Sequence, residues 1–247
     1  MVVDSNYGEH LKCKKSRETT ARGVLKSFLV VRTTIVVSMM RDTKDYTWIV
    51  TISDGRNERG DYRGVSKSLK VTNKLWLISD THFGHRNIIR FSQRPESHEA
   101  MMMSNWIERV SDSDQILHLG DVVMGPRGAQ ERWIKIVSVL PGQKFLILGN
   151  HDKLPISAFE RAGFTIVPEF VHKQIAFTHR PCLEDRYDDD GNDWKVNLHG
   201  HTHTNEWKPD HDGIPLGERT YINICVEHTD YYPVRLGNVY PIKQTAS

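Results

Sequence analysis

Residues that can bind metal ions follow five short apolar segments of the 247-residue chain. The segments and the residues after them are Leu75–Ser79 with Asp80-Thr81-His82, Gln115–Leu119 with Gly120-Asp121, Phe145–Leu148 with Gly149-Asn150-His151-Asp152, Ile175–Thr178 with His179-Arg180, and Val196–Leu198 with His199-Gly200-His201-Thr202-His203. In open α/β sheets, ligands bind at the carboxyl ends of the strands. Oxygen and imidazole ligands together suit divalent first-row metals, so the pattern predicts a metal site at one sheet edge.

The spacing within two of these motifs has a physical reason. Asp80 and His82 are two residues apart, and so are His201 and His203. In an extended chain, side chains two residues apart point the same way. We therefore expect each pair to face the metal site together.

Glycine residues precede the metal-binding residues of three motifs. Gly120, Gly149 and Gly200 let the backbone leave a strand sharply and approach a metal closely. Two neighbouring metals need a carboxylate between them, and Asp121 is placed to supply it.

The elements that must position these residues form an alternating pattern. Two helical stripes are expected from apolar residues at helical spacing: Met103, Trp106, Ile107 and Val110, then Trp133, Ile136, Val137 and Leu140. Further strands are expected at Tyr221–Val226 and Val234–Leu236. Short strands that alternate with helices indicate an α/β sheet covered by helices.

The charge distribution divides the chain near residue 74. Residues 1–74 hold 15 Lys and Arg against 8 Asp and Glu, whereas residues 75–247 hold 18 against 23. Roughly the first 22 residues of this basic N-terminal extension are polar and are expected to be disordered. Phe28–Met40 and Tyr46–Ile52 are β-like runs that predict a hairpin. Because an isolated hairpin is marginal in water, we expect it to dock, to extend a sheet or to form a homo-oligomer by pairing with another subunit.

Composition excludes some classes of protein. The chain lacks an apolar run of about 20 residues, the length that a membrane span needs. Met1–Lys14 has no apolar region typical of a secretory signal. Three widely separated cysteines do not indicate a disulfide framework. We expect a cytoplasmic protein without a membrane partner.

The ordered series of motifs resembles the calcineurin-like metallophosphoesterase superfamily. The segment Ser79–His85 is similar to the small bacterial and phage phosphodiesterases of this superfamily, and Tyr221–Val226 is similar to their closing strand. The resemblance implies a catalytic domain over 75–247 with an α/β fold. The implied architecture is a four-layer α/β/β/α sandwich of two mixed sheets flanked by helices. It does not explain the N-terminal extension.

The resemblance implies two metal sites that share one ligand. The first site is Asp80, His82 and His203, the second is Asn150, His179 and His201, and Asp121 bridges both. His151 is implied as the general acid, and Asp152 as the residue that orients it. The cofactors are expected to be two divalent ions per chain, Mn²⁺ first, with Fe, Zn²⁺ or Co²⁺ as alternatives.

The implied reaction is hydrolysis of phosphate esters by a metal-bridging hydroxide, with His151 as proton donor. We favour a phosphodiesterase on nucleotides or small phosphodiesters, including 2′,3′-cyclic nucleotides. The alternatives are a phosphomonoesterase or protein phosphatase, a nuclease that uses the basic N-terminal segment to bind nucleic acid, and a metal-bound scaffold without activity.

Three further residues are candidates for contacting the substrate. His85 and Asn87 follow the first motif in the same loop and are alternatively loop-fixing residues. Arg180 is next to His179 and suits bidentate phosphate contacts, or alternatively forms a surface ion pair.

Overall fold

The structure is a computed structural model that describes residues 68–205 and 219–242 in full and, before them, the backbone of the strands between residues 19 and 67. The chain divides into two compact units, Met1–Val71 and Thr72–Ser247. The disorder predicted for the first 22 residues falls outside the described part, except for residues 19–20.

The first unit is a five-stranded antiparallel sheet in which sequence neighbours pair. Its strands are β1 (Thr19–Thr20), β2 (Gly23–Val30), β3 (Thr33–Arg41), β4 (Tyr46–Arg56) and β5 (Tyr62–Lys70). The register of β4 against β5 shifts between Ser53 and Arg56.

The predicted hairpin corresponds to the antiparallel pair β3 and β4, but the sheet is larger than predicted and one of the predicted runs holds two strands. The run Phe28–Met40 was predicted as one strand, but it is divided between β2 and β3, which pair from Leu25↔Ser38 to Val30↔Thr33. Neither Val31 nor Arg32 is a typical turn residue, so this pattern lacked a turn signal. Three or more paired strands can be stable where an isolated hairpin is not.

The second unit begins with a five-stranded mixed sheet in the order β14-β6-β7-β8-β9. Its strands are β6 (Trp76–Ile78), β7 (Gln115–His118), β8 (Gln143–Leu146), β9 (Phe164–Ile166) and β14 (Val234–Arg235). β14 is antiparallel to β6, and the other pairs are parallel. The parallel strands β6, β7 and β8 therefore end at the same edge.

A four-stranded mixed sheet follows in the order β10-β11-β12-β13. Its strands are β10 (Phe170–His172), β11 (Ile175–Phe177), β12 (Val196–His199) and β13 (Thr220–Asn223). β10 is antiparallel to β11, and the rest are parallel. A bridge between Ser79 and Cys225 joins the chain after β6 to the chain after β13, so the ends of two sheets meet there.

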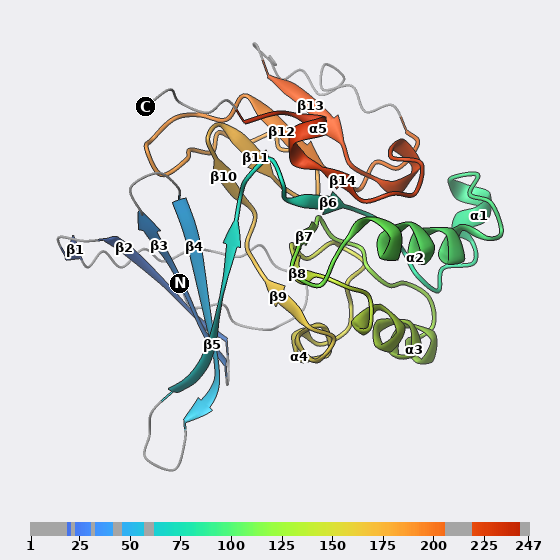
Figure 1. Cartoon of the computed structure of the whole chain (residues 1–247), viewed down its shortest axis with the longest axis horizontal. Helices are drawn as coiled ribbons and strands as arrows, with labels where there is room; N and C mark the ends of the chain where they lie inside the picture. The colour runs from blue at the N-terminus through green and yellow to red at the C-terminus, as the bar shows by residue number, and fades with distance from the viewer. Residues whose placement is uncertain are drawn as a thin grey trace. The chain divides into compact units, whose positions relative to one another are not determined.

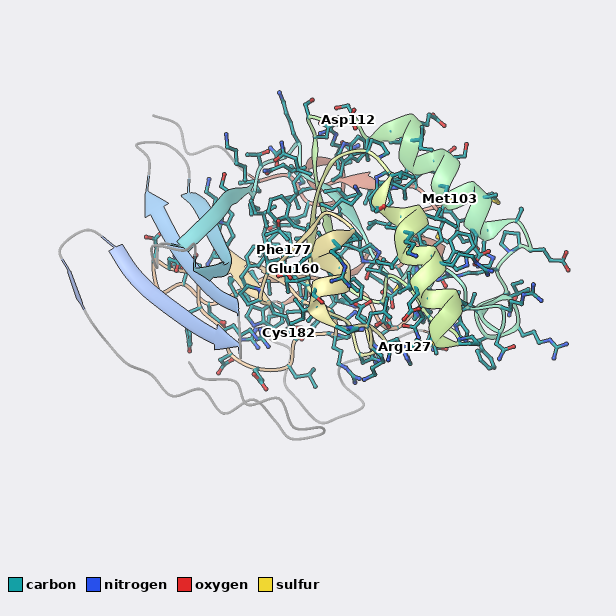
Figure 2. The ribbon with its side chains drawn as sticks, turned by 90° about the horizontal axis from the view of Figure 1, so that it is seen from below. Met103, Asp112, Arg127, Glu160, Phe177 and Cys182 are labelled. Atoms are coloured by element: carbon teal, nitrogen blue, oxygen red, sulfur yellow. The ribbon has the colours of Figure 1, made fainter. Side chains whose placement is uncertain are left out.

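The described part of the second unit also contains helices. They are α1 (Ile88–Phe91), α2 (His98–Arg109), α3 (Arg127–Ser138), α4 (Ile156–Arg161) and α5 (Leu236–Val239), with a 3₁₀ turn η2 (Val226–His228). Trp106 of α2, Val137 of α3 and Phe159 of α4 share one buried cluster with Ile78 of β6. α2 and α3 lie side by side in Figures 1 and 2. The expected α/β fold of two mixed sheets with helices is confirmed.

The buried face of α2 differs from the predicted stripe. Met102 and Trp106 are completely buried, whereas Ile107 is 61% exposed. The Trp106 indole N–H donates to the carbonyl of Pro141 at 2.9 Å, which fixes Trp106 inward and turns its sequence neighbour Ile107 outward. No helix among the described residues is long and apolar enough to cross a membrane.

Candidate metal centre

The predicted metal-binding residues converge where the parallel strands end. Backbone hydrogen bonds connect their loops. The Asp80 N–H donates to the carbonyl of Gly120 at 3.0 Å, and the Gly200 N–H donates to the backbone carbonyl of His179 at 2.9 Å. Residues from both sheets therefore reach one edge, as expected for a ligand site in an α/β fold.

The first cluster is Asp80, His82 and His203, whose potential ligand atoms lie within 4.8 Å of one another. Asp80 Oδ1 is 3.7 Å from both His82 Nε2 and His203 Nε2. Asp80 Oδ1 and His82 Nε2 are buried and have no hydrogen-bond partner. Buried polar atoms without a partner are costly, and a cation between them would satisfy both, so the donor set fits a divalent metal.

The second cluster is Asp121, His179 and His201, again within 4.8 Å. Asn150 joins it, since its Oδ1 is 3.0 Å from His179 Nε2. His179 Nδ1 is 2.8 Å from the carbonyl of Leu119. Donation to that carbonyl leaves Nε2 free to bind a metal.

Asp121 lies between the two clusters. Its Oδ2 is 3.5 Å from His82 Nε2 of the first cluster and 3.5 Å from His179 Nε2 of the second. Its Oδ1 accepts the backbone N–H of His151 at 2.7 Å. One carboxylate thus adjoins both clusters and the loop of the predicted proton donor.

Five of the predicted metal-binding residues have left-handed backbone conformations. The φ angles are 55° for Asp80, 47° for His82, 60° for Asp121, 70° for His201 and 49° for His203. The extended backbone predicted for the pair Asp80 and His82 and for the pair His201 and His203 is therefore wrong. The strands end before these residues, and the turns send His201 to the second cluster and His203 to the first.

Two glycines permit close approach of the backbone to the carboxylates. A Cβ atom at Gly149 would collide with the Asp121 carboxylate, and one at Gly200 would collide with the Asp80 carboxylate. His201 N–H, next to Gly200, donates to Asp80 Oδ2 at 2.9 Å. The sequence prediction of close approach at these two glycines agrees with this geometry.

An ion pair orients the first cluster. Glu227 Oε1 lies 2.9 Å from His203 Nδ1 and accepts from Arg94 Nε at 2.8 Å. Arg94 also donates to the carbonyls of Thr81 and Asp80 at 2.9 and 2.7 Å. Neither Arg94 nor Glu227 was predicted from the sequence as part of the site. Glu227 follows the predicted strand Tyr221–Val226, so the rule for strand ends would have found it.

Burial and charge set the ionisation of these groups. Burial alone would raise the pKa of Asp80, but the nearby imidazoles of His82, His179 and His203 bring it well below its usual range. Burial lowers the pKa of His201 to about 4. Burial opposes protonation of His203, but the Glu227 carboxylate raises its pKa above the usual value. Neutral imidazole, the form favoured at His201, is the form that binds metals.

The predicted proton donor lies beside both clusters. The ring centroids of His151 and His82 are 5.6 Å apart. His151 is partly exposed, and burial lowers its pKa. It lines a cleft next to the clusters.

Asp152 does not make the predicted contact with His151. Its carboxylate accepts the backbone N–H groups of Asp121, Val122 and Gly149 at 2.8, 2.9 and 2.8 Å, and it forms no hydrogen bond to the His151 imidazole within the described residues. Burial raises the pKa of Asp152 to about 7, although the hydrogen bonds from these three N–H groups lower it. Asp152 therefore fixes the loop that carries His151 rather than its ring.

The structure separates the candidates for substrate contact. His85 and Asn87 line the cleft with His151, and burial lowers the pKa of His85 to about 4. Arg180 is exposed and does not line this cleft.

Comparison with known proteins agrees with this centre. Residues 74–224 match the calcineurin-like phosphoesterase superfamily domain. The chain belongs to this superfamily. Its members are metal-dependent phosphoesterases, which assigns the chain to the hydrolases of phosphate esters.

Individual proteins are also similar to this chain in sequence or in structure. The uncharacterized protein MJ1445 of Methanocaldococcus jannaschii is 32% identical over 169 residues, which are 66% of this chain and 87% of that protein. Gene 66 protein of Mycobacterium phage L5 is 28% identical over 159 residues, 52% of this chain and 77% of that protein. The structure of AQ665 from Aquifex aeolicus, a protein of unknown function, is 28% identical with a TM-score of 0.52, covering 67% of this chain and 96% of that one.

Proposed function

We propose that the chain is a phosphodiesterase that acts on nucleotides or small phosphodiesters, including 2′,3′-cyclic nucleotides. The observation that carries this proposal is the position of Asp121. One of its oxygens is 3.5 Å from a histidine of each cluster, and the other accepts the backbone N–H of His151. One carboxylate therefore contacts both groups of proposed metal ligands and the backbone of the proposed proton donor.

Two divalent ions are the proposed cofactors, with Mn²⁺ favoured over Fe, Zn²⁺ and Co²⁺. The first ion would be held by Asp80, His82 and His203, with Asp121 shared. The second would be held by Asn150, His179 and His201. When bound, such ions polarise phosphate oxygens and lower the pKa of water to about 7.

The role proposed for His151 is proton transfer to the leaving group. Water attacks phosphorus, a new P–O bond forms and the bond to the leaving oxygen breaks. His151 in its protonated, imidazolium form gives the leaving oxygen a proton, and the proton released by the attacking water restores the protonated form of the enzyme. Because Asp152 and Asp121 hold the backbone of this loop, His151 keeps a fixed position beside the clusters. General acid catalysis of this kind contributes about 10²–10⁴-fold.

The proposed contacts to substrate come from His85 and Asn87, which share the cleft with His151. A phosphate contact by Arg180 stays a prediction. A cytoplasmic location is also proposed, because Cys182 and Cys225 are buried free thiols, which are typical of reducing compartments.

The test compares a diester with a monoester. Enzyme stripped of metal and reloaded with Mn²⁺ should hydrolyse bis-para-nitrophenyl phosphate faster than para-nitrophenyl phosphate. A preference for the monoester would replace the proposal with a phosphomonoesterase. Bound Mn²⁺ without hydrolysis of either compound would indicate a metal-bound scaffold.

A further inference from the structure

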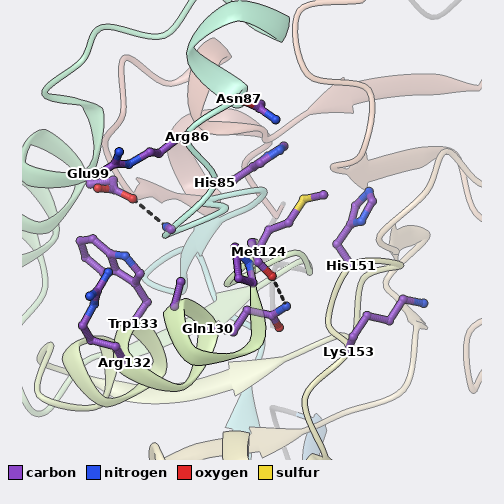
Figure 3. Close-up of a pocket in the computed structure, with 14 residues that line it drawn as sticks. His85, Arg86, Asn87, Glu99, Met124, Gln130, Arg132, Trp133, His151 and Lys153 are labelled. Atoms are coloured by element: carbon purple, nitrogen blue, oxygen red, sulfur yellow. Dashed lines mark hydrogen bonds between the residues drawn. The ribbon is translucent and has the colours of Figure 1, made fainter.

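A cleft of about 760 Å³ lies beside the predicted proton donor. Figure 3 shows His151 and Lys153 on one side, Trp133 and Arg132 of α3 on the other, and Met124 between them. Its size is within the range of small-molecule sites. The metal-binding residues are not among those that line it, so the cleft offers space beyond the scissile phosphate.

One wall of the cleft is a fixed aromatic surface. The Trp133 ring stacks on buried Phe83, with centroids 5.3 Å apart and planes 21° from parallel. Gly84 packs so closely that an added Cβ would lie 2.7 Å from Trp133 Cδ1. The indole is therefore held in place before any ligand arrives. Aromatic side chains of this kind stack favourably with nucleic-acid bases, whichever base is present.

The rim of the cleft carries excess positive charge. Arg86, Arg132 and Lys153 line it and are exposed, and within residues 68–205 and 219–242 none of them forms an ion pair. The one carboxylate among the lining residues, Glu99, accepts the backbone N–H of Gly84 at 2.7 Å. The cleft thus combines an aromatic wall with three cations that lack a counterion in the described part.

We infer that this cleft binds the leaving group of the reaction and that this group is a nucleotide carrying a phosphate of its own. The inference rests on the proposed function, in which His151, a residue that lines this cleft, gives a proton to the leaving group. The hydrolysed bond would then join two nucleotides. A 2′,3′-cyclic nucleotide has no second phosphate and would leave the three cations without a counterpart.

Dinucleotides test the need for a second phosphate. The substrates are thymidylyl-thymidine and the same compound with a terminal phosphate at its 5′ or its 3′ end, assayed with Mn²⁺. A terminal phosphate on the leaving nucleotide should raise kcat/KM by about fivefold or more at low salt, and the preference should shrink as salt rises. Equal kcat/KM for all three compounds would overturn the inference while leaving the phosphodiesterase proposal intact.

Charge removal locates the effect. Arg132→Gln should reduce the preference for the phosphorylated dinucleotide over bis-para-nitrophenyl phosphate by about threefold to tenfold, mainly through KM. The matched control is Arg161→Gln, an exposed arginine in the last turn of α4 that does not line the cleft, and it should leave the preference unchanged. An identical response in both variants would contradict the assignment of the cleft.

A binding measurement keeps the inference testable if no diester is hydrolysed. Calorimetric titration of the Mn²⁺-loaded protein should show tighter binding of thymidine 3′,5′-bisphosphate than of thymidine, with affinity lowered about fivefold in Arg132→Gln and unchanged in Arg161→Gln. Equal binding of the two compounds, or the same affinity in both variants, would refute a nucleotide site.

Discussion

The two halves of the candidate metal centre, which are its first and second clusters, are oriented by different means. In the first cluster, His203 Nδ1 lies 2.9 Å from a buried carboxylate, Glu227, which is paired with Arg94. In the second, His179 Nδ1 lies 2.8 Å from the backbone carbonyl of Leu119. The first half therefore depends on two side chains 133 residues apart, whereas the second depends on the backbone after β7. A single substitution can weaken the first half much more easily than the second.

The largest effect is expected where the halves meet. Asp121→Ala should remove tight binding of both metals, because the carboxylate adjoins both clusters. Elemental analysis after dialysis should find well under the two ions expected per chain. Activity should fall by about 10⁴-fold or more, since metals supply several kcal/mol of transition-state stabilisation. Full metal content in this variant would show that the halves do not share Asp121.

His151→Ala should lower turnover without breaking either half. Metal content should stay at the wild-type level, and kcat should fall by about 10²–10⁴-fold because the leaving oxygen receives no proton. The loss should be smaller for para-nitrophenolate, a leaving group that needs little protonation, than for a nucleoside. Equal losses for both leaving groups would contradict the role of proton donor.

Glu227→Gln should weaken only the first half. Substitution of a carboxylate that orients a metal-binding histidine costs about 10–100-fold in metal affinity. Titration with Mn²⁺ should therefore show one weakened site and one unchanged site. Glu108→Gln is the matched control, because Glu108 is an exposed carboxylate at the end of α2. Equal weakening of both sites would mean that Glu227 supports the fold as a whole.

The smallest effect is expected from Glu169→Gln. Glu169 accepts the backbone N–H of His179 at 3.1 Å and pairs with Arg186, so it is a side-chain support of the second half. Glutamine keeps an acceptor oxygen, and the Leu119 carbonyl still orients the imidazole. Mn²⁺ affinity at the second site should change by less than about fivefold, because a typical hydrogen bond contributes about 1 kcal/mol. A loss as large as that in Glu227→Gln would abolish the contrast between the halves.

Residue type and position were enough to predict which side chains gather at the centre, because strand ends define one edge whatever the details of the turns. The turn geometry itself was not predictable from spacing. Spacing alone indicated an extended segment in which His201 and His203 point the same way, whereas the family resemblance assigned them to different metal sites. Their backbone is left-handed, and they lie in different clusters. Asp, Asn and His are enriched among residues with positive φ, which was a weak signal at these positions.

Contacts between distant segments were harder to foresee. Arg94 follows no strand, and its pairing with Glu227 depends on how the loop before α2 returns to β6. The family resemblance assigned Asp152 to orient His151, yet its carboxylate accepts hydrogen bonds from three backbone N–H groups instead. In the N-terminal unit, the strand run from Phe28 to Met40 contained a chain reversal without a glycine, proline or asparagine to mark it.

The left-handed backbone at Asp80, His82, Asp121, His201 and His203 has a consequence for heat resistance. Each such residue costs on the order of 1 kcal/mol, so five together take up about 5 kcal/mol, comparable to the whole stability of a small domain. A ligand that binds only the folded state offsets such a cost. The melting temperature of this protein should therefore follow the supply of metal ions, and a cell short of them would lose the protein itself along with its activity.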